Sequence, residues 1–219
     1  RQRLRLIKRQ MIMSETVSFE SMHGLMFSVS GPSGVGKGTI IKEIKKIYPD
    51  CGHSISVTTR RPRGTEKDGV DYYFRSATEF EKLCIEGEIL EFDEYVGNFY
   101  GTPATPLLKM TECGRDVLLD LTIAGSMALK KKFSQAVTIF ILPPSLEVLE
   151  NRLVGRGTED RELVNRRLEK AREEILNANG FDYVVINDEL SDTVRKVEAI
   201  MIAEKCRYFR HSGIEKKFI

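Results

Sequence analysis

The fold of this chain is decided by the stretch GPSGVGKGT at residues 31–39. A short apolar run, residues 25–29, precedes it, and isoleucines at helical spacing follow it over residues 40–47. The glycines let consecutive backbone N–H groups point inward, the N-terminus of the following helix adds a positive dipole end, and Lys37 supplies a mobile cation. The sequence therefore predicts a phosphate-binding loop between a buried strand and a helix.

The loop departs in one position from the usual pattern of Gly, four residues, Gly-Lys and then Ser or Thr. Gly31 and Gly36-Lys37 fit, but Gly38 comes next and Thr39 stands one place late. The alternative is a glycine-rich turn without chemistry, which a strand before and a helix after disfavour. By itself the loop predicts nucleotide binding and little more.

Composition limits the classes of protein that this chain can represent. Its 219 residues, 41% of them hydrophobic, suffice for one compact core. The net charge is +2, but the first ten residues carry five basic and no acidic groups, which leaves 29 basic against 32 acidic residues, or −3, in the body. A body with this charge does not favour a general nucleic-acid surface.

The four cysteines are far apart and form no Cys-x-x-Cys pair, so neither zinc nor a disulfide framework is expected. No stretch approaches the length of a membrane span, and the N-terminus lacks the apolar block of a secretory signal. We expect a soluble, cytoplasmic protein with reduced thiols and no membrane partner.

Three further buried strands are expected at residues 116–121, 137–142 and 183–186, separated by helical patterns. They predict a parallel α/β sheet with ligands at the carboxyl ends of its strands. Residues 54–106 and 145–172 interrupt this rhythm and are interpreted as an acceptor module and a lid. In the former, Ser76 and Glu79 form a capping box ahead of a short helix.

Residues 1–21 begin with basic side chains and continue with polar ones, without a sustained period. We expect a disordered extension. It is either a membrane-surface or organelle-targeting arm or a dispensable extension, with Met11 or Met13 as alternative starts.

Several motifs together resemble guanylate kinase. They are the phosphate loop, TTRRPR at 58–63, GVDYYF at 69–74, GNFYG at 97–101, RGT at 156–158 and IND at 186–188. They occur in the order found in that family and cover residues 22 to about 207. The ordered set is far more specific than any of its members.

The resemblance implies an α/β fold: a P-loop NTPase-type three-layer core with a parallel sheet, an inserted mixed α/β GMP-binding module and a helical lid. The core with the P-loop is expected at 22–53, the GMP-binding module at 54–106, and more core at 107–144. The lid follows at 145–172, and 173–219 holds the last part of the core and a C-terminal helix.

Arg60 and Arg63 make chemical sense without the family name. They flank Pro62, which stiffens the backbone, so two guanidinium groups can converge on one phosphate dianion. Tyr72 and Tyr100 can donate phenolic O–H groups to the same phosphate. Alone, each would equally fit a solvated basic turn or ordinary half-buried packing.

Base choice is implied by the resemblance, which places Glu91 opposite the N1–H and 2-amino groups of guanine. Adenine lacks both donors there and would leave the carboxylate unmatched, at a cost of several kcal/mol on the order of a lost buried ionic hydrogen bond. Ser56 and Thr102 supply hydroxyls near the base. The alternative for Glu91 is a surface carboxylate beside Asp93 and Glu94.

The lid carries arginines. Arg152 and Arg156 lie four residues apart on one face, and Arg167 falls where the family has a further phosphate-facing arginine. Converging cations stabilise the charge of a moving phosphoryl group. The resemblance also makes Asn187 an adenine contact, whereas Arg161, Arg166 and Arg172 are expected on an exposed, salt-bridged helix.

One departure from the family follows the strand that ends at Leu119. The family commonly has Asp-x-Asp-x-Gln-Gly, and this chain has DLTIAG at residues 120–125. Asp120 is retained, but Thr122 and Ala124 replace an acid and an amide. Thr122 can still bind a base edge as donor or acceptor, without charge, and Ala124 has no polar role.

The resemblance implies an ATP:GMP phosphotransferase of purine nucleotide metabolism that uses Mg²⁺ with ATP, accepts GMP and dGMP, and works as a monomer or homodimer without nucleic acid. Thr39 is expected to contact Mg²⁺ directly or through water. The catalytic set is Lys37, Arg60, Arg152, Arg156 and Arg167. The ATP side comprises Gly31, Pro32, Ser33, Gly34, Val35, Gly36, Lys37, Gly38, Thr39, Arg156 and Asn187. The GMP side comprises Ser56, Arg60, Arg63, Tyr72, Glu91, Tyr100, Thr102, Asp120 and Thr122.

Two rival functions stay open at this point. One is a guanylate-kinase-like binding module without catalysis, against which the intact Gly36-Lys37 and the pair of Arg60 and Arg63 argue. The other is a related kinase with a different phosphorylated acceptor, which the changes at Thr122 and Ala124 leave open.

Overall fold

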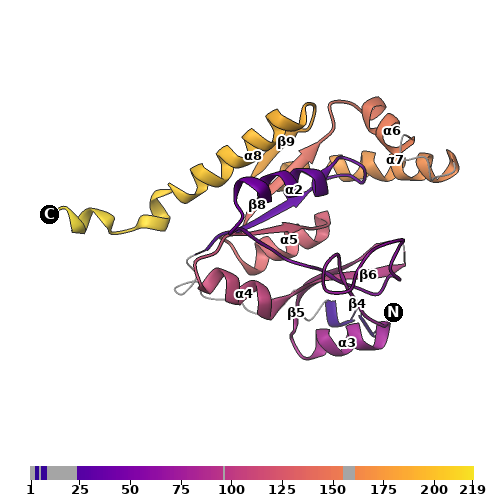
Figure 1. The fold of residues 1–219 in the computed structure, drawn as a ribbon, viewed down its shortest axis with the longest axis horizontal. Coiled ribbons are helices and arrows are strands. Elements are labelled where there is room, and N and C mark those ends of the chain that lie inside the picture. The colour runs from indigo at the N-terminus through magenta and orange to yellow at the C-terminus, as the bar shows by residue number, and fades with distance from the viewer. Residues whose placement is uncertain (1–2, 5, 9–23, 96, 155–160) are drawn as a thin grey trace. The chain divides into compact units, whose positions relative to one another are not determined.

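The computed structural model describes residues 3–4, 6–8, 24–95, 97–154 and 161–219. The chain forms two compact units (Figure 1). The first comprises Arg1–Ser30 and Pro49–Thr138, and the second Gly31–Tyr48 and Ile139–Ile219. The predicted phosphate loop belongs to the second unit, and the predicted acceptor module belongs to the first.

The first unit contains three parallel strands in the order β2-β7-β1. They are β1 (Met26–Ser30), β7 (Val117–Asp120) and β2 (Gly52–His53). Helices α4 (Ala104–Glu112) and α5 (Ile123–Lys132) belong to the same unit. All five residues of β1 are buried, as the apolar run predicts, and β1 and β7 share a core cluster with Leu107, Leu129 and Phe133.

A second sheet in this unit has the order β4-β3-β6-β5. Its strands are β3 (Val57–Thr58), β4 (Tyr73–Phe74), β5 (Ile89–Tyr95) and β6 (Asn98–Pro103), and α3 (Ala77–Ile85) lies close to β5 (Figure 1). The capping box predicted for Ser76 and Glu79 is confirmed at the start of α3. Aromatic rings of Phe80, Phe92 and Phe99 meet edge-on or tilted and form the core of this module.

A register shift interrupts the pairing of β5 with β6 between Ile89 and Glu91. Because side chains alternate along a strand, an extra residue at a bulge changes which of them share a face. Ile89 and Phe92 both join the apolar cluster around Phe80, while Glu91 and Asp93 lie on the other face. The irregularity thus places the carboxylates of Glu91 and Asp93 on the face of β5 that points away from the apolar cluster.

The structure describes five residues of the segment that we expect to be a disordered extension. Residues 3–4 and 6–8 are helical, and Leu4 is only 2% exposed within the cluster around Phe80. Arg3 pairs with Glu81 at 2.9 Å, and Lys8 with Asp93 at 2.7 Å. Leu4 and Ile7, three residues apart, supply one short apolar stripe that buries against the module.

The second unit contains α2 (Lys37–Ile47), β8 (Val137–Leu142) from Ile139 onward, and β9 (Tyr183–Ile186), which pairs parallel to β8. Helices α6 (Leu146–Val154) and α7 (Arg161–Ile175) lie side by side around a cluster of Leu149, Leu153, Val164 and Ala171. Ala178–Gly180 form the 3-10 turn η1. Ile40, Ile41 and Ile44 are buried along α2, as their spacing predicts.

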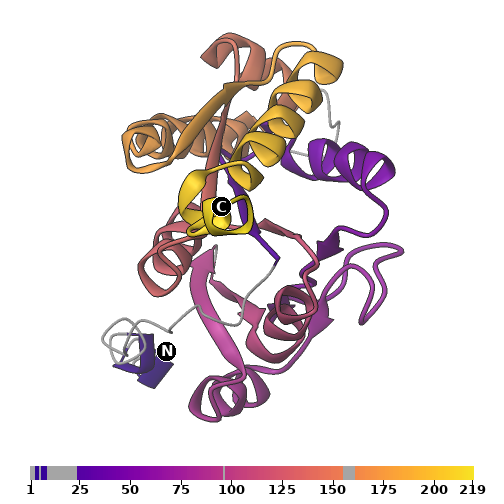
Figure 2. The ribbon, with the colours of Figure 1, turned by 90° about the vertical axis from the view of Figure 1, so that its left-hand side faces the viewer.

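Helix α8 (Leu190–Lys205) continues into two 3-10 turns, η2 (Tyr208–His211) and η3 (Ile214–Lys217), at the C-terminal end seen in Figure 2. Glu204, 1% exposed, accepts hydrogen bonds from Tyr183 at 2.6 Å and Arg210 at 3.0 Å. This buried carboxylate ties the start of the tail to β9. All four cysteines lie in the described residues and none of them forms a disulfide. None of the helices in those residues combines the length and apolar content of a membrane crossing.

Candidate active site in two halves

The predicted site residues fall into two groups, one in each unit. We call residues 31–39 with Arg152, Arg167 and Asn187 the loop site. We call Arg60, Tyr72, Glu91, Tyr100 and Thr102 the sheet site.

The loop site is built on glycines that no other residue can replace without strain. Gly31 has a φ of 146° and Gly36 a φ of 101°. A Cβ at Gly31 would lie 2.3 Å from the Ile141 carbonyl oxygen, and one at Gly36 would lie 2.8 Å from Nδ2 of Asn187. Gly36 is the residue before α2, so the loop leads directly into the positive end of that helix. At Gly38, by contrast, a Cβ would meet only open space.

Lys37 lies across this loop. Its Nζ donates to the Gly31 carbonyl at 2.9 Å, so the ammonium spans from the first turn of α2 back to the start of the loop. Helix α7 reaches the same segment, because Nη2 of Arg167 donates to Oγ of Ser33 at 2.7 Å. Two cations therefore meet at a loop whose backbone favours anions.

Glu174 of α7 also approaches the loop, which sequence reasoning missed. The Ser33 N–H donates to its carboxylate, and burial raises the pKa of Glu174 while Lys170 and Lys37 oppose that rise. A carboxylate on a backbone amide of the loop is a chemical stand-in for an anionic oxygen. The sequence signal was only its place about two turns beyond Arg167 on the same helix.

The Asn187 side chain holds the loop by a hydrogen bond to its backbone. Its Nδ2 donates to the Val35 carbonyl at 2.7 Å, and its Oδ1 accepts from Thr193 at 2.9 Å. The side chain is 6% exposed. The structure therefore gives Asn187 a role in holding the loop, beside the predicted adenine contact, which stays a prediction.

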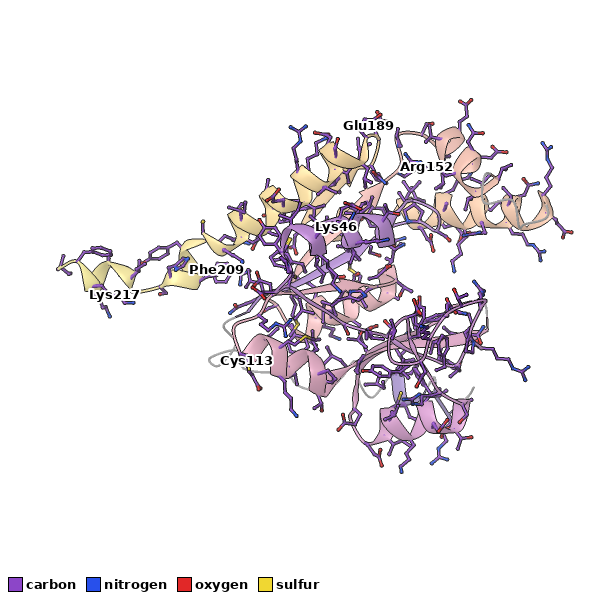
Figure 3. All side chains as sticks on the ribbon, in the orientation of Figure 1. Lys46, Cys113, Arg152, Glu189, Phe209 and Lys217 are labelled. Atoms are coloured by element: carbon purple, nitrogen blue, oxygen red, sulfur yellow. The ribbon has the colours of Figure 1, made fainter. Side chains whose placement is uncertain are left out.

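Arg152 points from α6 toward the segment that carries Glu189 (Figure 3). Its Nη2 donates to the Asn187 carbonyl oxygen at 3.0 Å. Its Nη1 is buried without a partner in the described residues. A buried guanidinium nitrogen without an acceptor is costly, and a phosphate oxygen is the acceptor that such a donor suits. The predicted lid residue Arg156 lies outside the described residues.

Thr39 fits the predicted magnesium contact in chemistry and exposure. It is exposed in the first turn of α2, and a hydroxyl oxygen is a ligand type that Mg²⁺ accepts beside waters and phosphate oxygens. In the part of the chain that the structure describes, no group of three or more His, Cys, Asp or Glu side chains could hold a metal. Oxygens from a nucleotide and from water would have to complete the coordination.

The sheet site collects polar side chains on one face of the four-stranded sheet. The register places Glu91 opposite Thr102 and Asp93 opposite Tyr100 across β5 and β6. Thr102 Oγ1 donates to Oε1 of Glu91 at 2.6 Å, and both residues are buried. The structure thus brings together Glu91 and Thr102, which lie eleven positions apart in sequence.

Burial raises the pKa of Glu91 to about 7. The hydrogen bond from Thr102 lowers it, the charge of Asp93 raises it, and Lys8 lowers it. A carboxylate with so high a pKa is poorly solvated and gains most from a ligand that offers hydrogen-bond donors.

Arg60 is 9% exposed and forms a bidentate ion pair with Glu66, with both N–O distances at 2.9 Å. The hydrogen bonds from Arg60 lower the pKa of Glu66. The Arg60 guanidinium also lies over the Tyr72 ring, 5.2 Å from its centroid. Glu66 was not identified from the sequence, although its carboxylate fixes the orientation of Arg60, which is predicted to bind phosphate.

The tyrosine rings of Tyr72 and Tyr100 lie edge to face, with centroids 6.0 Å apart. Burial raises the pKa of Tyr72, and the charge of Asp120 acts in the same direction. The Tyr72 phenol therefore remains a protonated donor at neutral pH. Arg63 is exposed, and Ser56 is half-buried directly before β3.

Thr122 is the residue before α5 and caps that helix, since its Oγ1 accepts from the Gly125 N–H at 3.1 Å. The same hydroxyl donates to Oδ2 of Asp93 at 3.0 Å. Asp93 was weighed from the sequence only as a neighbour of Glu91. The structure brings it to Thr122, at the position where the chain departs from the family pattern.

Comparisons with known proteins identify the family of this chain. The family model described as Guanylate kinase matches residues 26–204. A guanylate kinase of Desulfitobacterium hafniense is 44% identical over 191 residues, which cover 87% of this chain and 96% of that protein. One of Bacillus cereus is 46% identical, covering 85% and 92%. The crystal structure of guanylate kinase from Anaplasma phagocytophilum has a TM-score of 0.73 at 34% identity and covers 87% of this chain and 90% of that one. The chain belongs to the guanylate kinase family.

Proposed function

We propose that this protein transfers the γ-phosphoryl group of Mg²⁺-bound ATP to the 5′-phosphate of GMP, giving ADP and GDP, and that it accepts dGMP as well. The observation that carries the proposal is the buried Glu91, whose carboxylate accepts a hydrogen bond from Thr102, in a chain that belongs to the guanylate kinase family. We place the reaction in purine nucleotide metabolism in the cytoplasm, with a monomer or homodimer as the working unit.

Glu91 favours guanine by hydrogen-bond type. An ionised carboxylate only accepts hydrogen bonds, and guanine offers N1–H and 2-amino donors on one edge. Adenine presents an acceptor at N1 and no 2-amino group, so it leaves the buried carboxylate unmatched. Ser56 and Thr102 add hydroxyls beside it.

Arg60, Arg63, Tyr72 and Tyr100 bind the acceptor phosphate in this proposal. Arg60 is already oriented by Glu66, and its planar fork suits two phosphate oxygens. The phosphate nucleophile is largely ionised at neutral pH, so the chain needs no histidine base.

Lys37, Arg152, Arg156 and Arg167 neutralise the charge that spreads over the moving phosphoryl group. Mg²⁺ supplies further charge neutralisation on the ATP phosphates when bound. Thr39 would hold it directly or through water, with Asp120 as an outer carboxylate. Most of the rate enhancement then comes from positioning and electrostatics rather than from proton transfer.

The test is a coupled assay of ADP release with ATP and Mg²⁺ across GMP, dGMP, AMP, CMP, UMP and phosphorylated sugars. We expect turnover with GMP and dGMP and little with the others. Turnover confined to another acceptor would replace the proposed substrate, and no turnover with any acceptor would overturn the enzymatic proposal in favour of a binding module.

A further inference from the structure

Asp93 lies next to Thr122 and accepts the hydrogen bond that its hydroxyl donates. A threonine hydroxyl has one donor and two acceptor lone pairs, so its hydrogen-bonding role at a ligand is undefined unless neighbours fix it. Here two neighbours do so. Oγ1 of Thr122 donates to Oδ2 of Asp93 at 3.0 Å and accepts from the Gly125 N–H at 3.1 Å.

Asp93 is itself held from its other oxygen. Nζ of Lys8 lies 2.7 Å from Oδ1, so the carboxylate binds a cation on one side and the hydroxyl on the other. An ionised carboxylate offers no proton. The Thr122 proton is therefore committed to Asp93, and one acceptor lone pair of Oγ1 is left unused by the described residues.

The Thr122 hydroxyl oxygen lies near the Glu91 carboxylate. A Cβ built at Gly125 would lie 2.6 Å from Oε2 of Glu91 and 3.4 Å from Oγ1 of Thr122, so both oxygens border one point at the start of α5. Oε1 of Glu91 is turned toward Thr102. Two acceptors from two elements, β5 and the cap of α5, thus flank one small region of the sheet site.

We infer that Asp93 is a specificity-determining positioning residue: it fixes Thr122 as a hydrogen-bond acceptor, and Thr122 then accepts from the 2-amino group of the acceptor base. This inference rests on the proposed function. Glu91 takes N1–H and one amino hydrogen of guanine, and Thr122 takes the second amino hydrogen. At position 122 the base therefore meets an uncharged acceptor, the Thr122 hydroxyl. Asp93, which is distant in sequence, orients that hydroxyl.

IMP tests this assignment because it differs from GMP only in lacking the 2-amino group. The measurement is the ratio of kcat/KM for GMP to kcat/KM for IMP, with KM for ATP and the thermal midpoint recorded for every variant. One hydrogen bond to a neutral acceptor corresponds to a change of about three- to tenfold. Asp93→Ala is expected to lower the ratio by about that factor, mainly through GMP, with KM for ATP unchanged.

A double-mutant cycle separates positioning from direct contact or general damage. Thr122→Val should lower the ratio at least as far as Asp93→Ala does, and adding Asp93→Ala to it should lower the ratio no further. Thr122→Ser keeps the hydroxyl and the helix cap and should keep the ratio. Glu94→Ala, on the next position of β5 and off the face of Glu91 and Asp93, is the matched control and should leave it unchanged.

The outcomes distinguish the inference from the proposed function. If Asp93→Ala leaves the GMP-to-IMP ratio of kcat/KM unchanged in an active enzyme, the role of Asp93 is overturned. The role is also overturned if Asp93→Ala lowers this ratio equally in the wild type and in Thr122→Val. Equal losses with GMP and IMP would also overturn it, since they indicate structural damage without a change of base choice. A wild-type protein that does not phosphorylate GMP would overturn the proposed function first.

Discussion

The loop site and the sheet site solve different recognition problems by different means. The loop site presents mostly backbone: its glycines, the start of α2 and the Lys37 ammonium favour any polyphosphate. The sheet site presents side chains whose donors and acceptors are fixed by neighbours, such as Glu91 by Thr102 and Arg60 by Glu66. In the proposed reaction, backbone N–H groups and cations of the loop site bind the ATP phosphates, whereas oriented side chains of the sheet site select the acceptor base.

The two sites share one device, since each contains a carboxylate next to its anion-binding groups. Glu174 accepts a hydrogen bond from the Ser33 N–H in the loop site, and Glu66 forms a bidentate ion pair with Arg60 in the sheet site. A phosphate bound at either place must share these donors with the carboxylate or replace it. Variants that affect only one half can therefore test whether the halves act separately.

The largest effect is expected from Lys37→Met, which removes the mobile cation of the loop site. Loss of one charge-stabilising group commonly costs about 10²–10³ in kcat. We expect such a fall in kcat at saturating GMP, with KM for GMP little changed. Steady-state kinetics checks this, and Lys42→Met, on an exposed position of the same helix, is the control. A rise in KM for GMP with kcat intact would show that the halves do not divide as described.

Arg60→Lys tests the other half with nearly as large an effect. A lysine keeps the charge but loses the planar fork, so kcat/KM for GMP should fall about 10²-fold, while the affinity for ATP stays the same. Binding of each nucleotide alone can be followed by calorimetry. Arg61→Lys, at an exposed neighbouring position, should be silent. Equal weakening of ATP and GMP binding would contradict the proposed division.

Glu91→Gln sharpens the contrast in base choice and adds a pH signature. The amide keeps the shape but offers only one acceptor, so kcat/KM for GMP should fall by about 10-fold or more, with ATP binding unchanged. Because the pKa of Glu91 is raised to about 7, the ionised form appears only as pH rises through that value. In the wild type kcat/KM for GMP should rise between pH 6 and 8 with a step that the variant lacks.

The same pKa shift predicts an effect on stability without any ligand. A carboxyl whose pKa is about 7 in the folded protein and 4.5 as the ordinary value binds more protons when folded, so its burial costs stability as pH rises from about 4.5 to 7. Glu91→Gln should therefore raise the thermal midpoint at pH 8 and change it little at pH 4.5. A midpoint difference that is the same at both pH values would refute this explanation.

The smallest effect is expected from Asn187→Ala. It leaves the Val35 carbonyl and the Thr193 hydroxyl without their partner, which should cost about 1–3 kcal/mol of unfolding free energy and raise KM for ATP modestly. Urea unfolding and KM measurements check both. Asn177→Ala, exposed at the start of a 3-10 turn, is the control. A changed preference for ATP over GTP at full stability would instead favour the adenine contact.

Some of these features could be predicted from sequence because they depend on neighbours along the chain. The loop at residues 31–39, the isoleucine face of α2 and the capping box of Ser76 and Glu79 are set by residues within one or two turns. Gly31 and Gly36 have conformations that only glycine adopts readily, so their spacing alone marked the loop. The ordered motifs then identified the family through residues such as Arg60 and Glu91.

Other features depended on contacts between distant segments, which local patterns do not encode. The bulge between Ile89 and Glu91 decides which face of β5 carries carboxylates. Leu4 becomes buried only because the cluster around Phe80 exists to receive it. The sequence by itself determined the loop, the order of the strands along the chain and the family. Only the tertiary structure decided that Asp93 meets Thr122, Glu66 meets Arg60 and Glu174 meets Ser33, because hydrogen bonds between such partners form only once packing has brought the backbones together.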